Sequence, residues 1–171
     1  MQIAKIRTKN ILSRSKIGSG GYAINPYVGC PHGCIYCYAE FMRGVTGHEE
    51  AWGEFLDVKD FDAASLVKFA ASHGGERVFM SSVTDCYNSY EARFGATRKV
   101  LEAVAGSDIN LQILTKSSLV TRDIDLLQTM PNVRVGVSLS VIDESLRRTL
   151  EPRANSVAAR VAAIKSYAPR E

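Results

Sequence analysis

The chain has 171 residues, of which 46% are hydrophobic and 23% charged, proportions that are typical of one globular domain and exclude wholesale disorder. Its 21 Lys and Arg residues exceed the 18 Asp and Glu residues by three, too small an excess to indicate a nucleic-acid partner on charge alone. No apolar run approaches the roughly 18 residues of a membrane span, and Met1–Lys9 lacks the apolar core of a secretory signal. We therefore expect a cytoplasmic protein with no membrane partner.

The first 21 residues are interpreted as an N-terminal arm, followed by a core of residues 22–171. The arm carries five basic residues, which are Lys5, Arg7, Lys9, Arg14 and Lys16. A solvated surface is the usual role of such residues, and contact with a phosphate group is the alternative.

From Phe61 onward, helical and strand patterns alternate along the chain. The expected strands are Arg77–Val83, Ile109–Leu114 and Val133–Leu139, with Tyr22–Val28 as a possible first strand. Helices are expected between these strands, ending near Gly74-Gly75, Gly106 and Pro131, and then over Asp143–Leu150 and Ser156–Tyr167. About four βα units with a parallel sheet follow from this alternation. An eight-unit barrel typically needs about 250 residues, so the predicted fold is an α/β partial (β/α) barrel.

Three of the four cysteines lie within eight residues of each other. Cys30, Cys34 and Cys37 have C-x3-C-x2-C spacing, and three thiolates this close on one loop can converge on a soft metal centre. A [4Fe–4S] cluster would leave its fourth iron open to a non-protein ligand. A structural zinc ion would need a fourth ligand, for which Cys86 or His48 is available. Cysteines without a role are the remaining alternative.

This motif, with Tyr36 before its last cysteine, resembles that of the radical S-adenosylmethionine (radical SAM) superfamily. The flanking Asn25-Pro26-Tyr27 and Tyr38-Ala39 resemble the spore photoproduct lyase-like subgroup. Later segments are similar to the same subgroup: Ser81-Ser82-Val83-Thr84-Asp85, Leu114-Thr115-Lys116-Ser117, Arg122-Asp123, and Leu150-Glu151-Pro152 with Ser156 and Arg160. The resemblance covers nearly the whole chain. It also implies further βα units, so the sequence is expected to be an N-terminal part of such a protein.

The resemblance implies a function and its cofactors. A [4Fe–4S] cluster on the three cysteines would cleave S-adenosylmethionine to a 5′-deoxyadenosyl radical that abstracts a hydrogen atom. An electron donor of the flavodoxin or ferredoxin type would be a partner. The substrate stays open: a pyrimidine photodimer in DNA is compatible, although no basic stripe with interleaved aromatics supports nucleic acid. The alternative function is a non-catalytic binding module stabilised by zinc or iron–sulfur.

Hydroxyl and ammonium groups follow the predicted strands, where parallel βα units place their ligand sites. Thr84 follows the first of these strands and Lys116 the second, while Ser138 and Ser140 close the third. Such groups are suitable donors for the methionyl carboxylate and the ribose of S-adenosylmethionine. Each also has an ordinary alternative as a turn residue, a cap or a solvated loop residue.

The resemblance adds three residues to this candidate site. It implies that Glu151 and Arg160 lie near the nucleoside, and Tyr36 has a role beside the cluster or a packing role. In spore photoproduct lyase, a cysteine two residues before the position of Thr84 donates a hydrogen atom. Ser82 stands there in this chain, and its O–H bond is too strong for that step. Cys86 is expected to pack in the core, so strict spore photoproduct lyase activity is not expected.

Overall fold

The computed structural model describes residues 1–15 and 20–167, so Lys16 and Gly18-Ser19 of the predicted arm lie outside the described residues. The strands are β1 (Gln2–Arg7), β2 (Leu12–Ser15), β3 (Gly21–Ile24), β4 (Tyr27–Val28), β5 (Phe55–Asp60), β6 (Arg77–Met80), β7 (Asn110–Thr115) and β8 (Val133–Val137). Five of them form one sheet in the order β2-β3-β6-β7-β8, and the other three form a second sheet in the order β1-β5-β4.

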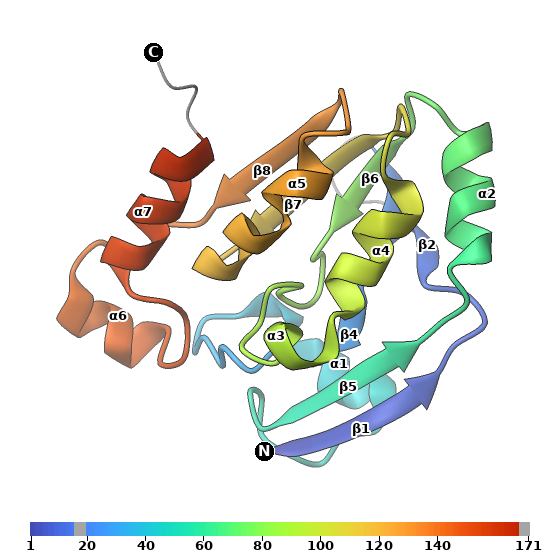
Figure 1. Ribbon diagram of the computed structural model, residues 1–171. Helices are drawn as coiled ribbons and strands as arrows, with labels where there is room; N and C mark the ends of the chain where they lie inside the picture. Colours follow the sequence, from blue (N-terminus) through green and yellow to red (C-terminus); the bar gives the residue numbers. More distant parts are fainter. Residues whose placement is uncertain (16–19, 168–171) are drawn as a thin grey trace.

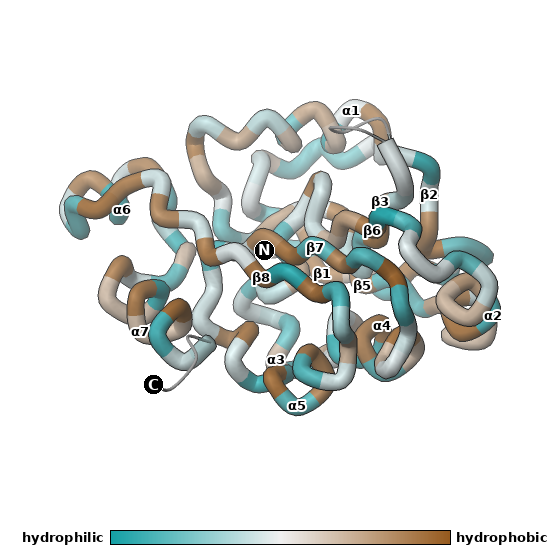
Figure 2. Tube along the Cα trace, turned by 90° about the horizontal axis from the view of Figure 1, so that it is seen from above, coloured by the Kyte–Doolittle hydropathy of each residue, from teal (hydrophilic) through white to brown (hydrophobic). Residues whose placement is uncertain are grey.

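From β4 onward, helices separate the successive strands (Figure 1). They are α1 (Met42–Thr46), α2 (Ala64–Ser72), α3 (Glu91–Phe94), α4 (Ala96–Val104), α5 (Ile124–Leu127), α6 (Glu144–Leu150) and α7 (Val157–Tyr167), with 3-10 turns at Tyr38–Phe41 and Ser118–Asp123. Figure 2 shows α2, α4 and α5 on one side of the large sheet and α1 on the other. No helix among the described residues is long and apolar enough to cross a membrane.

The large sheet buries one face under the helices. Side chains of a strand alternate between its two faces, so Val78 and Met80 of β6 and Leu111 and Ile113 of β7 all point the same way. These four side chains belong to the main hydrophobic core. The opposite face, which carries Leu114 among others, remains partly exposed.

Four parallel strands, β3, β6, β7 and β8, confirm the predicted α/β fold with a parallel sheet. The expected strand over Tyr22–Val28 is divided between the two sheets, as β3 and β4. The strand expected over Arg77–Val83 ends at Met80, because Ser81 takes a positive φ of 82° and the chain turns out of the sheet.

The predicted N-terminal arm contains two paired strands. All six residues of β1 pair in parallel with β5, from Gln2 opposite Phe55 to Arg7 opposite Asp60. β2 pairs antiparallel with β3 at the edge of the large sheet. Ile3, which is partly buried, packs against the small core cluster of the three-stranded sheet and helps to hold β1 in place.

Candidate functional site

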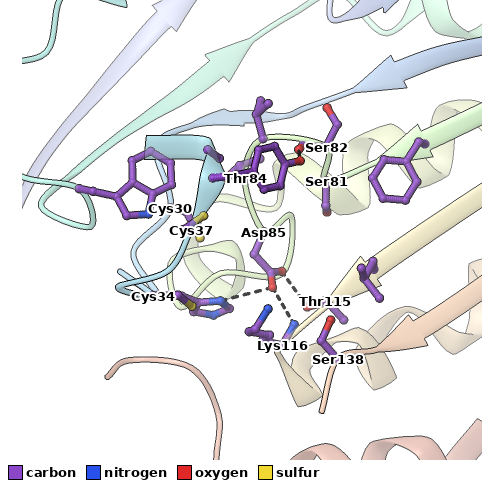
Figure 3. Close-up of a pocket in the computed structure, with 17 residues that line it drawn as sticks. Cys30, Cys34, Cys37, Ser81, Ser82, Thr84, Asp85, Thr115, Lys116 and Ser138 are labelled. Atoms are coloured by element: carbon purple, nitrogen blue, oxygen red, sulfur yellow. Dashed lines mark hydrogen bonds and ion pairs between the residues drawn. The ribbon is translucent and has the colours of Figure 1, made fainter. Parts of the chain in front are cut away.

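A cavity of about 170 Å³ lies at the carboxyl ends of β6, β7 and β8 (Figure 3). The cysteine loop, residues 29–38, closes its other side. Thr84 lines it after β6, Lys116 after β7 and Ser138 after β8. The carboxyl ends of parallel strands are where α/β proteins place ligands, so the fold puts this cavity in a favourable position.

The three cysteines of the motif all line this cavity, and all three are free thiols. Burial raises the pKa of the Cys34 thiol to about 12, although the nearby Lys116 ammonium opposes the rise. Within residues 1–15 and 20–167, no three Cys, His, Asp or Glu side chains stand close enough to ligate one metal ion. Each thiolate of a [4Fe–4S] cluster binds a different iron, so such ligands need not meet at one point. Three free thiols on one cavity wall are a donor set that fits such a cluster.

Neighbouring motifs hold the start of the cysteine loop. Thr84 Oγ1 donates a hydrogen bond to the Gly29 carbonyl at 2.6 Å. Asn25 Nδ2 donates to Ser82 Oγ at 2.8 Å, and the Val83 N–H donates to Asn25 Oδ1 at 3.2 Å. The segments at residues 25–29 and 82–84 are therefore one hydrogen-bonded unit, and the Thr84 hydroxyl is already committed to the loop.

Arg153 fastens the same loop from the far end of the sequence. Its Nε donates to the Pro31 carbonyl at 2.7 Å, and its Nη2 donates to the Gly53 carbonyl at 2.8 Å. Gly33 and Gly53 both have positive φ, and a Cβ on Gly53 would lie 2.8 Å from the Gly33 Cα. Glycine at these two positions permits the close approach of the two backbones.

A buried ion pair joins the cysteine loop to β7. His32 Nδ1 lies 3.3 Å from Asp85 Oδ2, which also accepts a hydrogen bond from the Lys116 N–H at 2.7 Å. Burial disfavours the imidazolium, but Asp85 and Cys30 together raise the pKa of His32 to about 10. Burial also disfavours the Asp85 carboxylate, but His32 and its hydrogen-bond donors hold the pKa of Asp85 below its usual value. Both groups are therefore charged at neutral pH.

A second network surrounds Glu151. Its carboxylate accepts a hydrogen bond from the Tyr36 hydroxyl and another from Arg160 Nη2 at 2.5 Å, and Lys116 Nζ lies 3.9 Å away. Arg160 Nη1 donates to the Ser138 carbonyl at 2.9 Å. The structure thus links the loop, β7, β8 and α7 through one buried carboxylate.

The site residues expected from sequence fall into two groups. Thr84, Lys116 and Ser138 line the cavity with the cysteines, whereas Tyr36, Glu151 and Arg160 lie behind it in the Glu151 network. Ser140 is exposed and hydrogen-bonds the Tyr36 hydroxyl. Burial and the bond to Glu151 raise the pKa of Tyr36 to about 12, while the bond to Ser140 lowers it. Cys86 is fully buried in the main core and does not line the cavity.

Four further residues shape the site without having been predicted: His32, Trp52, Asp85 and Arg153. Asp85 had a signal, because it directly follows Thr84 at the end of a strand. His32 lies between two of the cysteines, and nothing in the sequence marks it as the partner of Asp85. Arg153 had no local signal, since it acts on a loop 122 residues earlier.

Residues 24–169 match the family model of the radical SAM superfamily. The chain belongs to the radical SAM superfamily. The superfamily implies a [4Fe–4S] cluster, S-adenosylmethionine and a reductant.

Several uncharacterized proteins are similar to this radical SAM chain. One from Methanocaldococcus jannaschii is 35% identical over 166 residues, which cover 97% of this chain and 62% of that protein. One from Acidianus two-tailed virus is 31% identical, covering 86% of this chain and 51% of the other. One from Mycobacterium tuberculosis is 35% identical, covering 84% of this chain and 44% of that protein. The chain therefore spans between 44% and 62% of the length of these relatives.

Solved structures of spore photoproduct lyase share the fold. A complex of that enzyme with dinucleoside spore photoproduct gives a TM-score of 0.72 at 19% identity, covering 95% of this chain and 46% of the other. A mutant with bound AdoMet and dinucleoside spore photoproduct gives a TM-score of 0.68 at 20% identity, with the same coverage. The radical SAM chain described here thus has the fold of rather less than half of that enzyme.

Proposed function

We propose that this radical SAM chain binds a [4Fe–4S] cluster through Cys30, Cys34 and Cys37 and binds S-adenosylmethionine in the adjoining cavity. The observation that carries the proposal is that the three thiols share one cavity with the Lys116 ammonium and with the Thr84 and Ser138 hydroxyls, at the carboxyl ends of parallel strands. The cluster, when bound, supplies the electron that cleaves S-adenosylmethionine to a 5′-deoxyadenosyl radical for hydrogen abstraction.

The residues of the chain have separate tasks in this proposal. Lys116 is the one cation among the cavity-lining residues besides His32, and its ammonium is suited to the methionyl carboxylate. The Ser138 hydroxyl is available for the ribose, whereas the Thr84 hydroxyl holds Gly29 at the start of the loop. Glu151 and Arg160 keep Lys116 and the end of β8 in place from behind, and Tyr36 ties the loop to Glu151.

The proposal also includes a class of substrate. We place a pyrimidine photolesion first, because spore photoproduct lyase, whose fold this chain shares, has been solved with a dinucleoside photoproduct. Ser82 lines the cavity, and its O–H bond is too strong for it to replace a hydrogen-donating thiol. The reaction therefore differs from that of spore photoproduct lyase in the step that returns a hydrogen atom. A flavodoxin- or ferredoxin-type donor in a reducing cytoplasm completes the proposal.

Anaerobic reconstitution followed by reduction with dithionite tests the proposal. About four irons and matching sulfide per chain should bind, and S-adenosylmethionine should alter the electron paramagnetic resonance (EPR) spectrum of the reduced cluster. Release of 5′-deoxyadenosine is then measured by chromatography. Stoichiometric zinc without sulfide would instead identify a structural metal module and overturn the proposal.

A further inference from the structure

The large sheet carries a second hollow, about 320 Å³ in volume, at the amino ends of β6, β7 and β8. Its lining is polar and consists of Arg77, Asn110, Gln112, Asn132 and Arg134. No carboxylate of the described residues lines it, and neither arginine side chain forms a hydrogen bond or an ion pair within the described part of the chain. Two uncompensated positive charges in one hollow favour an anionic ligand.

The other polar groups of this hollow are partly engaged. Asn110 Nδ2 donates to the Gly75 carbonyl at 3.0 Å, and Asn132 Nδ2 donates to Asp108 Oδ1 at 2.5 Å. The two guanidinium groups are therefore the strongest donors that remain for a ligand. A guanidinium binds phosphate oxygens in pairs, so the hollow is best suited to a phosphate group.

The strand register places this hollow beside the cysteine cavity, on the same face of the sheet. Phe79 and Leu114 line the cysteine cavity, whereas Gln112 and Arg134 line the hollow. Phe79 on β6 pairs with Gln112 on β7, which pairs in turn with Arg134 on β8. Because neighbouring strands lie about 4.8 Å apart, about 10 Å separates Phe79 from Arg134. One extended molecule can touch both.

Gly136 leaves the face open between the hollow and the cavity. It lies on β8 midway between Arg134 and Ser138, and alternate residues of a strand share a face. Its φ is not positive, so the backbone conformation does not require glycine here. A Cβ at this position would lie 3.0 Å from Leu114 Cδ1. Glycine inside a strand often marks a close approach of a ligand to the backbone.

We propose that this face binds the substrate of the radical reaction, and that the substrate is a nucleotide. Its phosphate would be held by Arg77 and Arg134, and its base would lie on Phe79 and Leu114 at the edge of the cysteine cavity. An aromatic ring is a stacking platform for any base. The inference rests on the proposed function, because it names the substrate of the same site and the group that fixes its position.

A nuclear magnetic resonance (NMR) titration of the cluster-free chain tests the phosphate contact by itself. The probes are thymidine 5′-monophosphate and thymidine, which differ only in the phosphate. The monophosphate should bind more tightly, and Arg77→Gln or Arg134→Gln should weaken its binding about tenfold while leaving thymidine unchanged. Arg148→Gln is the matched control, because Arg148 is an exposed arginine of α6 outside the hollow. Gly136→Val should weaken the binding of both probes, since its side chain would cover the face.

Equal affinities of the unmodified chain for the two probes would overturn the inference. The same loss in Arg148→Gln as in the other two arginine variants would also overturn it, because the attraction would then be one of overall charge. Inorganic phosphate and acetate are titrated as well, and tighter binding of acetate would indicate a carboxylate partner instead. Iron and sulfide contents after reconstitution separate the two proposals. A chain that discriminates between the probes but takes up no cluster refutes the proposed function, whereas a chain that takes up the cluster without discriminating refutes the phosphate site alone.

Discussion

Arg160 Nη2 lies 2.5 Å from Glu151 Oε2, and neither side chain is exposed to solvent. The other guanidinium nitrogens of Arg160 donate to the backbone carbonyls of Asn155 and Ser138. With Tyr36 and Lys116 also at the Glu151 carboxylate, the ion pair lies where the cysteine loop, β7, β8 and α7 meet.

Replacing Arg160 by Met should be strongly destabilising. Removing one partner of a buried ion pair leaves an uncompensated charge, which costs about 3–5 kcal/mol of unfolding free energy. Arg148→Met is the matched control. The Arg148 side chain is 73% exposed and pairs with Glu144 at 3.8 Å. Exposed ion pairs of this kind contribute at most about 1 kcal/mol to stability. Equal urea-unfolding curves for the two variants would contradict the importance of the buried pair.

Replacing any one of Cys30, Cys34 and Cys37 by Ala should abolish most of the iron bound on anaerobic reconstitution. The reason is that each thiolate would hold a separate iron of the cluster. Cys86→Ala is the control. Cys86 is fully buried and does not line the cavity, so this substitution should leave the iron content unchanged. Iron and labile sulfide per chain are the measurements, and equal iron in all four variants would contradict the ligand assignment.

Lys116→Ala should weaken S-adenosylmethionine binding while leaving the iron content intact. Losing a hydrogen bond to a charged group costs about 1.5–3 kcal/mol, which is roughly ten- to hundred-fold in affinity. Lys99→Ala serves as a control, since Lys99 lies on α4 against Phe61, outside the cysteine cavity. The affinities are measured by calorimetry, and an unchanged value for Lys116→Ala would remove this residue from the binding site.

Gly53→Ala should destabilise the protein by about 1–3 kcal/mol and lower its iron uptake. The added Cβ would lie 2.4 Å from Arg153 Nη2, at a backbone φ of +92° that side chains rarely adopt. Gly44→Ala in α1 is the control, because nothing lies within 4 Å of its added Cβ and helices favour Ala over Gly. Thermal unfolding and iron content are compared, and equal values for the two variants would count against a tight contact between residues 33 and 53.

Stability should fall as the pH rises above the ordinary histidine pKa of about 6.5, in part because of His48. Burial disfavours its charged ring, but hydrogen bonds to Asp57 and Glu50, both at 3.0 Å, outweigh burial and raise the pKa of His48. A raised pKa in the folded state stabilises the protein fully below 6.5, and this contribution is lost as the pH passes through the folded-state value. His48→Gln should show a weaker fall in melting temperature over this range. The same pH dependence in both proteins would contradict the assignment.

The sequence was sufficient for those parts of the molecule that local patterns specify. Leu111 and Ile113 alternate in a short apolar run and are buried as one face of β7, and the spacing of the three cysteines predicted a shared site. β1 and β5 were missed because apolar and charged residues are mixed in Gln2–Arg7 and its pairing partner lies about fifty residues away. The contacts made by Arg153 and the pairing of His32 with Asp85 were also missed. Both join residues that are far apart in the sequence, so no local pattern predicts them.

The long span between Pro31 and Arg153 has a consequence for biosynthesis. The arginine that fixes the cysteine loop lies 122 residues after the loop carbonyl that it binds. At about 5–20 residues per second, ribosomes need roughly 6–24 s to make that stretch. The nascent chain therefore exposes the three thiols of the cysteine loop well before Arg153 is made. Iron and sulfide have to be delivered after this interval, or the thiols have to be protected during it.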